Sequence, residues 1–81
     1  DYRMFYVYIL KLSNGKYYIG YSSKLKNRVD DHINGNVRQT RNFIPLRLIY
    51  YSAFKNKLKA LQFEHYLKTP SGFAFRNKRF I

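Results

Sequence analysis

Two segments rich in aromatic and β-branched residues lie close together near the start of the chain. Residues 5–12 (FYVYILKL) and 17–21 (YYIGY) have the composition of β-strands. The polar stretch between them, Ser13-Asn14-Gly15-Lys16, contains an Asn and a Gly, which tolerate positive φ in tight turns. The pattern predicts a β-hairpin.

The length of that turn decides whether Tyr8 and Tyr18 can act together. A two-residue turn at Asn14-Gly15 pairs Tyr8 with Tyr21, which puts Tyr8 and Tyr18 on opposite faces of the sheet. A three-residue loop with a glycine bulge pairs Tyr8 with Ser22, and the two tyrosines then share a face. A joint role therefore requires an odd-length or bulged turn.

The middle of the chain has the pattern of an amphipathic helix followed by a polar segment. Ser22 or Ser23 can cap a helix, and the apolar residues that follow recur every four positions, at Leu25, Val29 and Ile33. Glycine and asparagine in residues 34–36 predict its end. Residues 36–45 are polar and basic, which indicates a loop or a short helix.

The second half of the chain predicts a third strand and two more helices. Residues 46–54 have strand composition, and apolar positions in residues 56–68 have helical spacing. The Thr69-Pro70-Ser71-Gly72 stretch breaks that helix, and we expect a last short helix over residues 73–81. The order ββαβαα predicts an α+β fold: a small, three-stranded, mostly antiparallel sheet flanked by helices, in one domain over residues 1–81.

The charge of the chain points to a polyanionic partner. Sixteen Lys and Arg against four acidic residues give a net charge of +12. Phosphate groups of a nucleic acid suit such a surface, because counterion release drives binding; a merely solubilising surface usually mixes both signs. There is no cysteine and no apolar run long enough for a membrane span. We therefore expect a soluble, cytoplasmic, nucleoid-associated monomer with no membrane partner.

Arg28 and His32 lie four residues apart and so share one face of the expected helix. Both border the apolar stripe, so their side chains should emerge at the edge of the packed interface. There a guanidinium suits a phosphate clamp, and an imidazole suits proton handling or the orientation of a neighbour. The alternative is a solvated arginine and a half-buried histidine with a satisfied hydrogen bond.

Glu64 is the only glutamate in the chain and borders the apolar face of the second helix. Its carboxylate could hold one divalent metal ion, with water and substrate phosphate completing the coordination shell. The alternative is a simple ion pair with Lys68, four residues later. His65 faces another side of the helix and is expected at the surface or in packing.

These residues together resemble the motifs of the GIY-YIG nuclease superfamily. Tyr6-Val7-Tyr8 stands where the family has Gly-Ile-Tyr, and Tyr18-Ile19-Gly20 matches the second motif. Arg28 and His32 follow at family-like spacing, and Glu64 resembles the family's metal-binding glutamate. The chain is most similar to small stand-alone members related to the catalytic module of the excinuclease incising subunit. The resemblance covers nearly the whole chain.

The resemblance implies a Mg²⁺- or Mn²⁺-dependent endonuclease that hydrolyses DNA, with DNA repair as its setting. By this analogy Glu64 holds the metal, Tyr8 or Tyr18 helps to deprotonate the attacking water, Arg28 stabilises phosphate charge and His32 assists a tyrosine. The DNA could be branched, nicked or single-stranded, and RNA is a further candidate. The competing hypothesis is a nucleic-acid-binding module of the same fold that is catalytically weak or inactive.

Three stretches depart from the family pattern. The first motif has Tyr6 in place of its glycine. Pro70 and Phe73 stand where relatives usually have glycine and arginine, and Asn77 is out of register with the asparagine that follows the glutamate helix in many family enzymes. No role is therefore carried over to Phe73 or Asn77.

Overall fold

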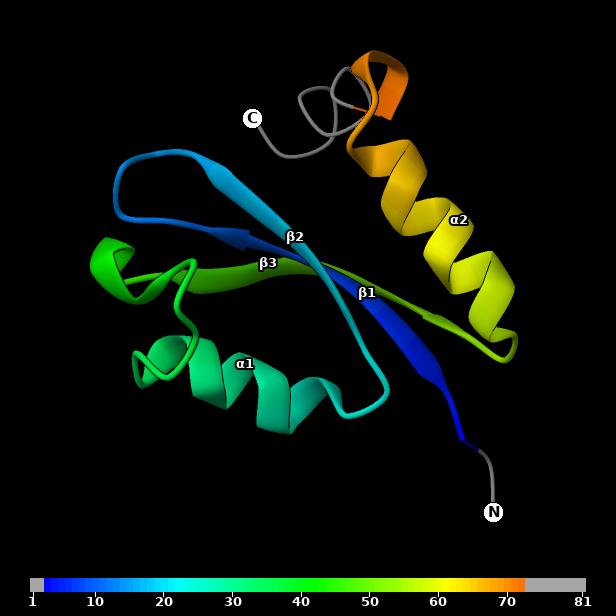
Figure 1. Ribbon diagram of the computed structural model, residues 1–81, viewed down its shortest axis with the longest axis horizontal. Helices are drawn as coiled ribbons and strands as arrows, with labels where there is room; N and C mark the ends of the chain where they lie inside the picture. Colours follow the sequence, from blue (N-terminus) through cyan, green and yellow to red (C-terminus); the bar gives the residue numbers. More distant parts are fainter. Residues whose placement is uncertain (1–2, 73–81) are drawn as a thin grey trace.

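The computed structural model describes residues 3–72 of the chain. Along this part, strand β1 (Phe5–Lys11) is followed by β2 (Tyr17–Ser22), helix α1 (Leu25–Ile33), a 3₁₀ helix (Arg41–Phe43), strand β3 (Arg47–Phe54) and helix α2 (Lys57–Leu67) (Figure 1). The predicted order is confirmed as far as α2. The last helix predicted over residues 73–81 lies outside the described residues, as do Phe73 and Asn77.

The three strands form one antiparallel sheet with β1 at its centre, in the order β2-β1-β3. The central strand is apolar on both faces: four consecutive residues, Val7 to Leu10, are at most 1% exposed. Both outer strands are edges, and only β2 has a glycine in its middle. This position of β2 matters for the site described below.

The two helices cover opposite faces of the sheet (Figure 1). On one face Val7 and Ile9 pack with Ile19 and with α2 through Ala60 and Leu67. On the other, Tyr8 and Leu10 pack with Val29 of α1 and with Leu46. Alternate residues of β1 therefore serve two separate cores, as the two-residue repeat of a strand requires.

The hairpin between β1 and β2 has a three-residue loop, Ser13-Asn14-Gly15. The Gly15 N–H donates to the Leu12 carbonyl (3.0 Å) and the Leu12 N–H to the Lys16 carbonyl (2.8 Å), with Gly15 at φ 83°. Tyr8 pairs with Gly20, so Tyr8 and Tyr18 share a face, as an odd-length loop requires. The predicted Tyr8–Ser22 pairing is wrong by two residues, because the loop begins one residue earlier than expected.

Helix α1 differs from its prediction at its start and in its apolar stripe. The residue at its N-cap is Lys24, and no side chain caps the helix; the Ser22 hydroxyl instead accepts a hydrogen bond from the Lys24 N–H (2.9 Å). Ile33 is 46% exposed, whereas His32 is fully buried. The buried side of the helix therefore continues from Val29 to His32, three residues on, and not to Ile33. The helix ends at Asn34 and Gly35, as predicted.

Helix α2 begins at a true side-chain cap, because the Asn56 side chain accepts a hydrogen bond from the Lys59 N–H (3.1 Å). The predicted break after it is shorter than expected: residues 68 and 69 interrupt the helix, and residues 70–72 are helical again. Proline is compatible with the first turn of a helix, where its missing N–H has no partner to lose. No helix within residues 3–72 has the length and apolar character to cross a membrane.

Candidate active site

An open depression of about 570 Å³ lies along the edge strand β2. Its walls include four of the five residues expected to take part in catalysis: Tyr8, Tyr18, Arg28 and Glu64. The fifth, His32, does not line the depression and lies behind Tyr8. Gly20, Gln39 and Lys68 also contribute to the walls.

Gly20 lets the Tyr8 side chain reach the edge of the sheet. Tyr8 stands directly opposite Gly20 in the β1–β2 pairing. A Cβ atom on Gly20 would lie 2.3 Å from both the Cζ and the hydroxyl oxygen of Tyr8. No real Cβ contact is that short, so the glycine of the Tyr18-Ile19-Gly20 motif leaves the space that the phenol fills.

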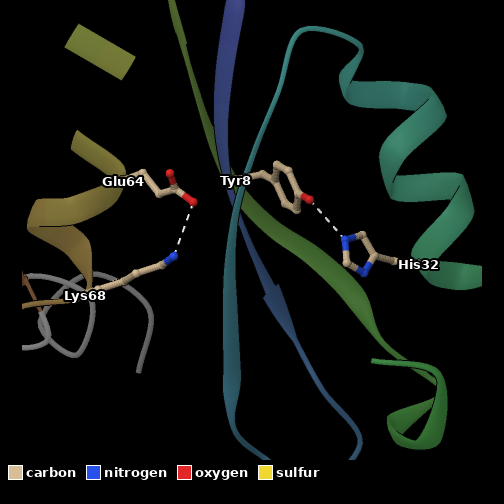
Figure 2. Close-up of polar contacts among 4 residues, drawn as sticks. All are labelled: Tyr8, His32, Glu64 and Lys68. Carbon is tan, nitrogen blue, oxygen red and sulfur yellow. Dashed lines mark hydrogen bonds and ion pairs between the residues drawn. The ribbon is translucent and has the colours of Figure 1, made fainter. Parts of the chain in front are cut away.

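Tyr8 is the first of three buried side chains that are joined in series by hydrogen bonds. The Tyr8 hydroxyl lies 3.0 Å from His32 Nε2, and His32 Nδ1 lies 2.7 Å from the Thr40 hydroxyl oxygen (Figure 2 shows the first of these contacts). The exposed fractions of Tyr8, His32 and Thr40 are 1%, 0% and 0%. His32 was expected at the margin of the helix interface; it is instead fully enclosed, with both ring nitrogens partnered.

Burial keeps the rings of Tyr8 and His32 uncharged. Desolvation is the main cause that raises the pKa of Tyr8 to about 12, and the nearby Arg28 guanidinium only partly opposes it. Desolvation, reinforced by the positive charge of Arg28, lowers the pKa of His32 to about 4. At neutral pH the site therefore holds a protonated phenol against a neutral imidazole.

Tyr18 and Arg28 complete this side of the depression. The Tyr18 ring lies 4.9 Å from the His32 ring and 6.5 Å from the Tyr8 ring, centre to centre. Tyr18 and Arg28 are both partly exposed, in contrast to Tyr8. The arrangement puts the Tyr18 phenol and the Arg28 guanidinium at the surface of the depression, with the Tyr8 phenol and the His32 imidazole buried beside them.

Glu64 reaches the depression from the opposite face of the sheet. Figure 2 shows Glu64 and Lys68 on one side of β2 and Tyr8 and His32 on the other. Glu64 therefore meets the other residues around the edge of β2 and not across one face of the sheet. This is possible because β2 is an edge strand, so no further strand separates α2 from the tyrosines.

The alternative considered for Glu64 is also present, since Lys68 Nζ lies 3.3 Å from a Glu64 carboxylate oxygen. The Glu64 side chain is 20% exposed and that of Lys68 is 54% exposed. The exposed His65 takes no part. Within residues 3–72 no group of three or more His, Cys, Asp or Glu side chains is arranged to bind a metal ion.

A single half-buried carboxylate beside an open depression nevertheless fits one Mg²⁺-type ion. Such ions take oxygen ligands, and Mg²⁺ keeps several waters and is often held by one or two carboxylates together with substrate phosphate. Glu64 supplies one oxygen-donor group, and the depression leaves room for water and phosphate.

Thr40 is a member of the site that the sequence did not indicate. It belongs to a polar, basic stretch without apolar periodicity and lies eight residues after His32. A buried histidine needs a partner for each ring nitrogen, but nothing in the sequence says which hydroxyl supplies it.

Comparison with known proteins agrees with this geometry. The model of the GIY-YIG catalytic domain matches residues 4–78, almost the entire chain. The chain belongs to the GIY-YIG catalytic domain family. GIY-YIG domains are nucleases, so membership implies a nucleic acid as the class of substrate, and the predicted α+β fold is confirmed.

Individual GIY-YIG relatives are small proteins of the UPF0213 group. One from Clostridium perfringens is 39% identical over 66 residues, which cover 80% of this chain and 71% of the relative. Another from Streptococcus pneumoniae is 38% identical over 64 residues, covering 78% of this chain and 65% of the relative. The solution NMR structure of a UPF0213 protein from Bacillus halodurans superposes with a TM-score of 0.59 at 29% identity, covering 93% of this chain and 83% of that one. The names of these relatives state no activity.

Proposed function

We propose that this chain is a divalent-metal-dependent endonuclease that hydrolyses phosphodiester bonds of DNA. The observation that carries the proposal is the depression at β2, where Tyr8, Tyr18, Arg28 and Glu64 meet from strands β1 and β2 and helices α1 and α2. Those are the side chains that the family resemblance implicates. The net charge of +12 supports a polyanionic substrate.

Arg28 is the residue that we assign to the scissile phosphate. Its guanidinium presents planar donors that match phosphate oxygens. It is partly buried at the wall of the depression, so its interaction with developing charge is screened less than that of a surface lysine.

The two tyrosines are assigned to the attacking water. Tyr8 is held by His32 and is protonated at neutral pH, so its contribution in the resting enzyme is to orient the water by a hydrogen bond. Tyr18 is more exposed to the depression and is the better placed of the two to exchange a proton with solvent. His32 orients Tyr8 and does not itself contact substrate.

Glu64 would hold the metal ion, Mg²⁺ or Mn²⁺. When bound, such an ion supplies positive charge beside the phosphate and lowers the pKa of a coordinated water. Lys68 would leave its ion pair with Glu64 and become available to a second phosphate oxygen. An exposed pair of this kind is worth at most about 1 kcal/mol, so the exchange costs little.

The experiment is a nicking assay with supercoiled plasmid and with nicked, branched and single-stranded DNA, in Mg²⁺, Mn²⁺ and EDTA. We expect cleavage by the wild type that EDTA abolishes and that Glu64→Gln reduces by at least about a hundredfold, as for loss of a key transition-state interaction. His65→Gln changes the neighbouring exposed residue and should cleave normally. Failure of the wild type to cleave any DNA form would refute the proposal.

The second candidate is a binding module that has kept the fold without efficient catalysis. Two observations favour it: burial raises the pKa of Tyr8 to about 12, and Glu64 is already paired with Lys68. In that case DNA binding would be salt-sensitive and indifferent to Glu64→Gln, with no cleavage. Competition between DNA and RNA of equal length would show which nucleic acid it prefers.

A further inference from the structure

The buried hydrogen bonds that join Tyr8, His32 and Thr40 can run in either of two donor-to-acceptor directions. The direction decides whether Tyr8 presents a proton or a lone pair to substrate. A neutral imidazole carries one N–H, so one ring nitrogen donates and the other accepts. If Nδ1 carries the proton, it donates to the Thr40 oxygen and the Tyr8 hydroxyl donates to Nε2. If Nε2 carries the proton, it donates to the Tyr8 oxygen, and the phenol proton is free to point elsewhere.

Two properties of the partners favour the first direction. A phenol, with an ordinary pKa near 10, is a far stronger acid than an aliphatic alcohol, so it is the better donor to an imidazole nitrogen. For the same reason the alcohol oxygen of Thr40 is the better acceptor for an N–H group.

The third property is the position of Arg28. Its guanidinium acts on Tyr8 strongly enough to lower the pKa of that phenol, although burial outweighs this effect. Arginine carries positive charge and donors only, so the side of the Tyr8 oxygen that faces Arg28 favours a lone pair over a proton. The phenol proton is then best placed toward His32 Nε2, 3.0 Å from the Tyr8 oxygen.

We propose that Thr40 is a positioning residue: it accepts the Nδ1 proton of His32, which directs the Tyr8 proton inward and leaves the Tyr8 oxygen as an acceptor at the depression. An attacking water is oriented when an acceptor binds one of its hydrogens. A phenol proton that pointed outward would instead bind the oxygen of the water, whose lone pair must face the phosphorus. The effect on catalysis rests on the proposed function, whereas the direction of these hydrogen bonds does not depend on it.

The direction can be measured in the wild-type protein without any cleavage. Long-range ¹⁵N–¹H NMR spectra of ¹⁵N-histidine-labelled protein distinguish the protonated ring nitrogen from the bare one. A His65→Gln background leaves His32 as the only histidine. We expect a protonated Nδ1 and an unprotonated Nε2 at pH 7; a protonated Nε2 would overturn the inference.

Substitutions then test whether Thr40 sets this direction. Thr40→Val keeps the shape of the side chain and removes the hydroxyl, whereas Thr40→Ser keeps the hydroxyl. We expect Thr40→Val to lose the Nδ1–H form and, in a cleaving enzyme, to lower kcat at least about tenfold with unchanged DNA affinity. Thr40→Ser should restore both. An unchanged tautomer and kcat in Thr40→Val would exclude a positioning role.

A matched control separates this effect from general loss of a hydrogen bond. Ser52 forms a side-chain contact with Tyr50 on β3, away from the depression, so Ser52→Ala removes a hydroxyl without touching His32. It should leave the tautomer and kcat unchanged, and a tautomer change there would contradict the inference. If the wild type shows Nδ1–H but never cleaves, the nuclease proposal fails while the inferred direction of the Tyr8–His32–Thr40 hydrogen bonds stands.

Discussion

At the scale of single residues, the site depends on a glycine at position 20. Gly20 has no Cβ, and the Tyr8 phenol occupies the space that a Cβ would need. Gly15 also lacks a Cβ, but there the reason is its positive φ of 83°, with nothing within 4 Å of the added atom. The two glycines thus serve the site and the turn, respectively.

Substituting each glycine with alanine should separate these two reasons. We expect Gly20→Ala to lower the free energy of unfolding by about 1–3 kcal/mol through overpacking and to abolish activity, because Tyr8 must move. Gly15→Ala should cost about 1 kcal/mol or more through backbone strain, while the folded fraction keeps its activity. Urea unfolding and the nicking assay measure both. Equal loss of activity per folded molecule would contradict this distinction.

His32 should make the stability of the protein depend on pH below neutrality. Its pKa is about 4 in the folded chain, against about 6.5 when unfolded, so between these values the unfolded chain binds more protons. Stability therefore falls as the pH falls through this window, by about 2 kcal/mol between pH 7 and pH 5.

Urea unfolding at a series of pH values measures this effect. His32→Gln, which cannot titrate, should be less stable at pH 7 but should lose less on acidification than the wild type. Arg28 and Asp31 are the charged groups that influence His32, so their substitution should shift the window. The same acid-induced loss in His32→Gln would show that another group is responsible.

At the scale of elements, the two helices are anchored in different ways. Helix α2, which carries Glu64, starts at the Asn56 side-chain cap, whereas α1 starts at Lys24 without one. The serines before α1 have the right residue type, but the Ser22 hydroxyl accepts from the N–H of Lys24, the residue before the helix, and no side chain caps the helix itself. Residue type alone could not distinguish a cap from a turn contact.

Removing each polar side chain should show this difference in stability. We expect Asn56→Ala to cost about 1 kcal/mol, typical of a lost N-cap, and to weaken metal-dependent cleavage because α2 positions Glu64. Ser23→Ala should change stability by less than about 0.5 kcal/mol, since Ser23 makes no cap to α1. Chemical denaturation measures both, and a larger cost for Ser23→Ala would refute the assignment.

The hairpin shows how an element controls the site. With a three-residue loop, Tyr8 and Tyr18 share the α1 face; one residue fewer would turn Tyr18 to the other side. The sequence identified the turn and the two possible outcomes, but the starting residue of the loop was wrong. Pairing within a hairpin depends on the conformation of the turn residues as well as on their identity.

At the scale of the whole molecule, charge dominates. With 16 Lys and Arg but only four acidic residues, positive side chains outnumber negative ones four to one. The two ion pairs found among residues 3–72, Lys26–Asp30 and Lys68–Glu64, are both exposed or partly exposed i,i+4 pairs. Such pairs contribute little to stability, so the charge is available for a partner.

DNA binding should therefore depend steeply on salt. The logarithm of the association constant should fall linearly with that of the salt concentration, with a slope of roughly −0.9 per duplex phosphate neutralised. Arg28→Gln should make the slope shallower by about one unit, whereas Glu64→Gln, which removes a negative charge, should not. Fluorescence anisotropy at several NaCl concentrations measures this. A slope near zero would exclude phosphate-driven binding.

The sequence by itself determined the local elements, the charge and the candidate residues of this protein. The strands, the first two helices and the charge follow from local composition and periodicity. The candidate residues follow from the resemblance to the GIY-YIG motifs: Tyr8, Tyr18, Arg28, His32 and Glu64. These are properties of short stretches, because a strand or an amphipathic helix is encoded in the order of neighbouring side chains.

Only the tertiary structure decided how those residues meet. It enclosed His32 completely, gave it Thr40 as a second partner, and brought Glu64 to the tyrosines around the edge of β2 rather than across one face. The physical reason is that burial and long-range hydrogen bonds arise from the packing of separate elements. No pattern within one segment specifies which side chain of another will complete it.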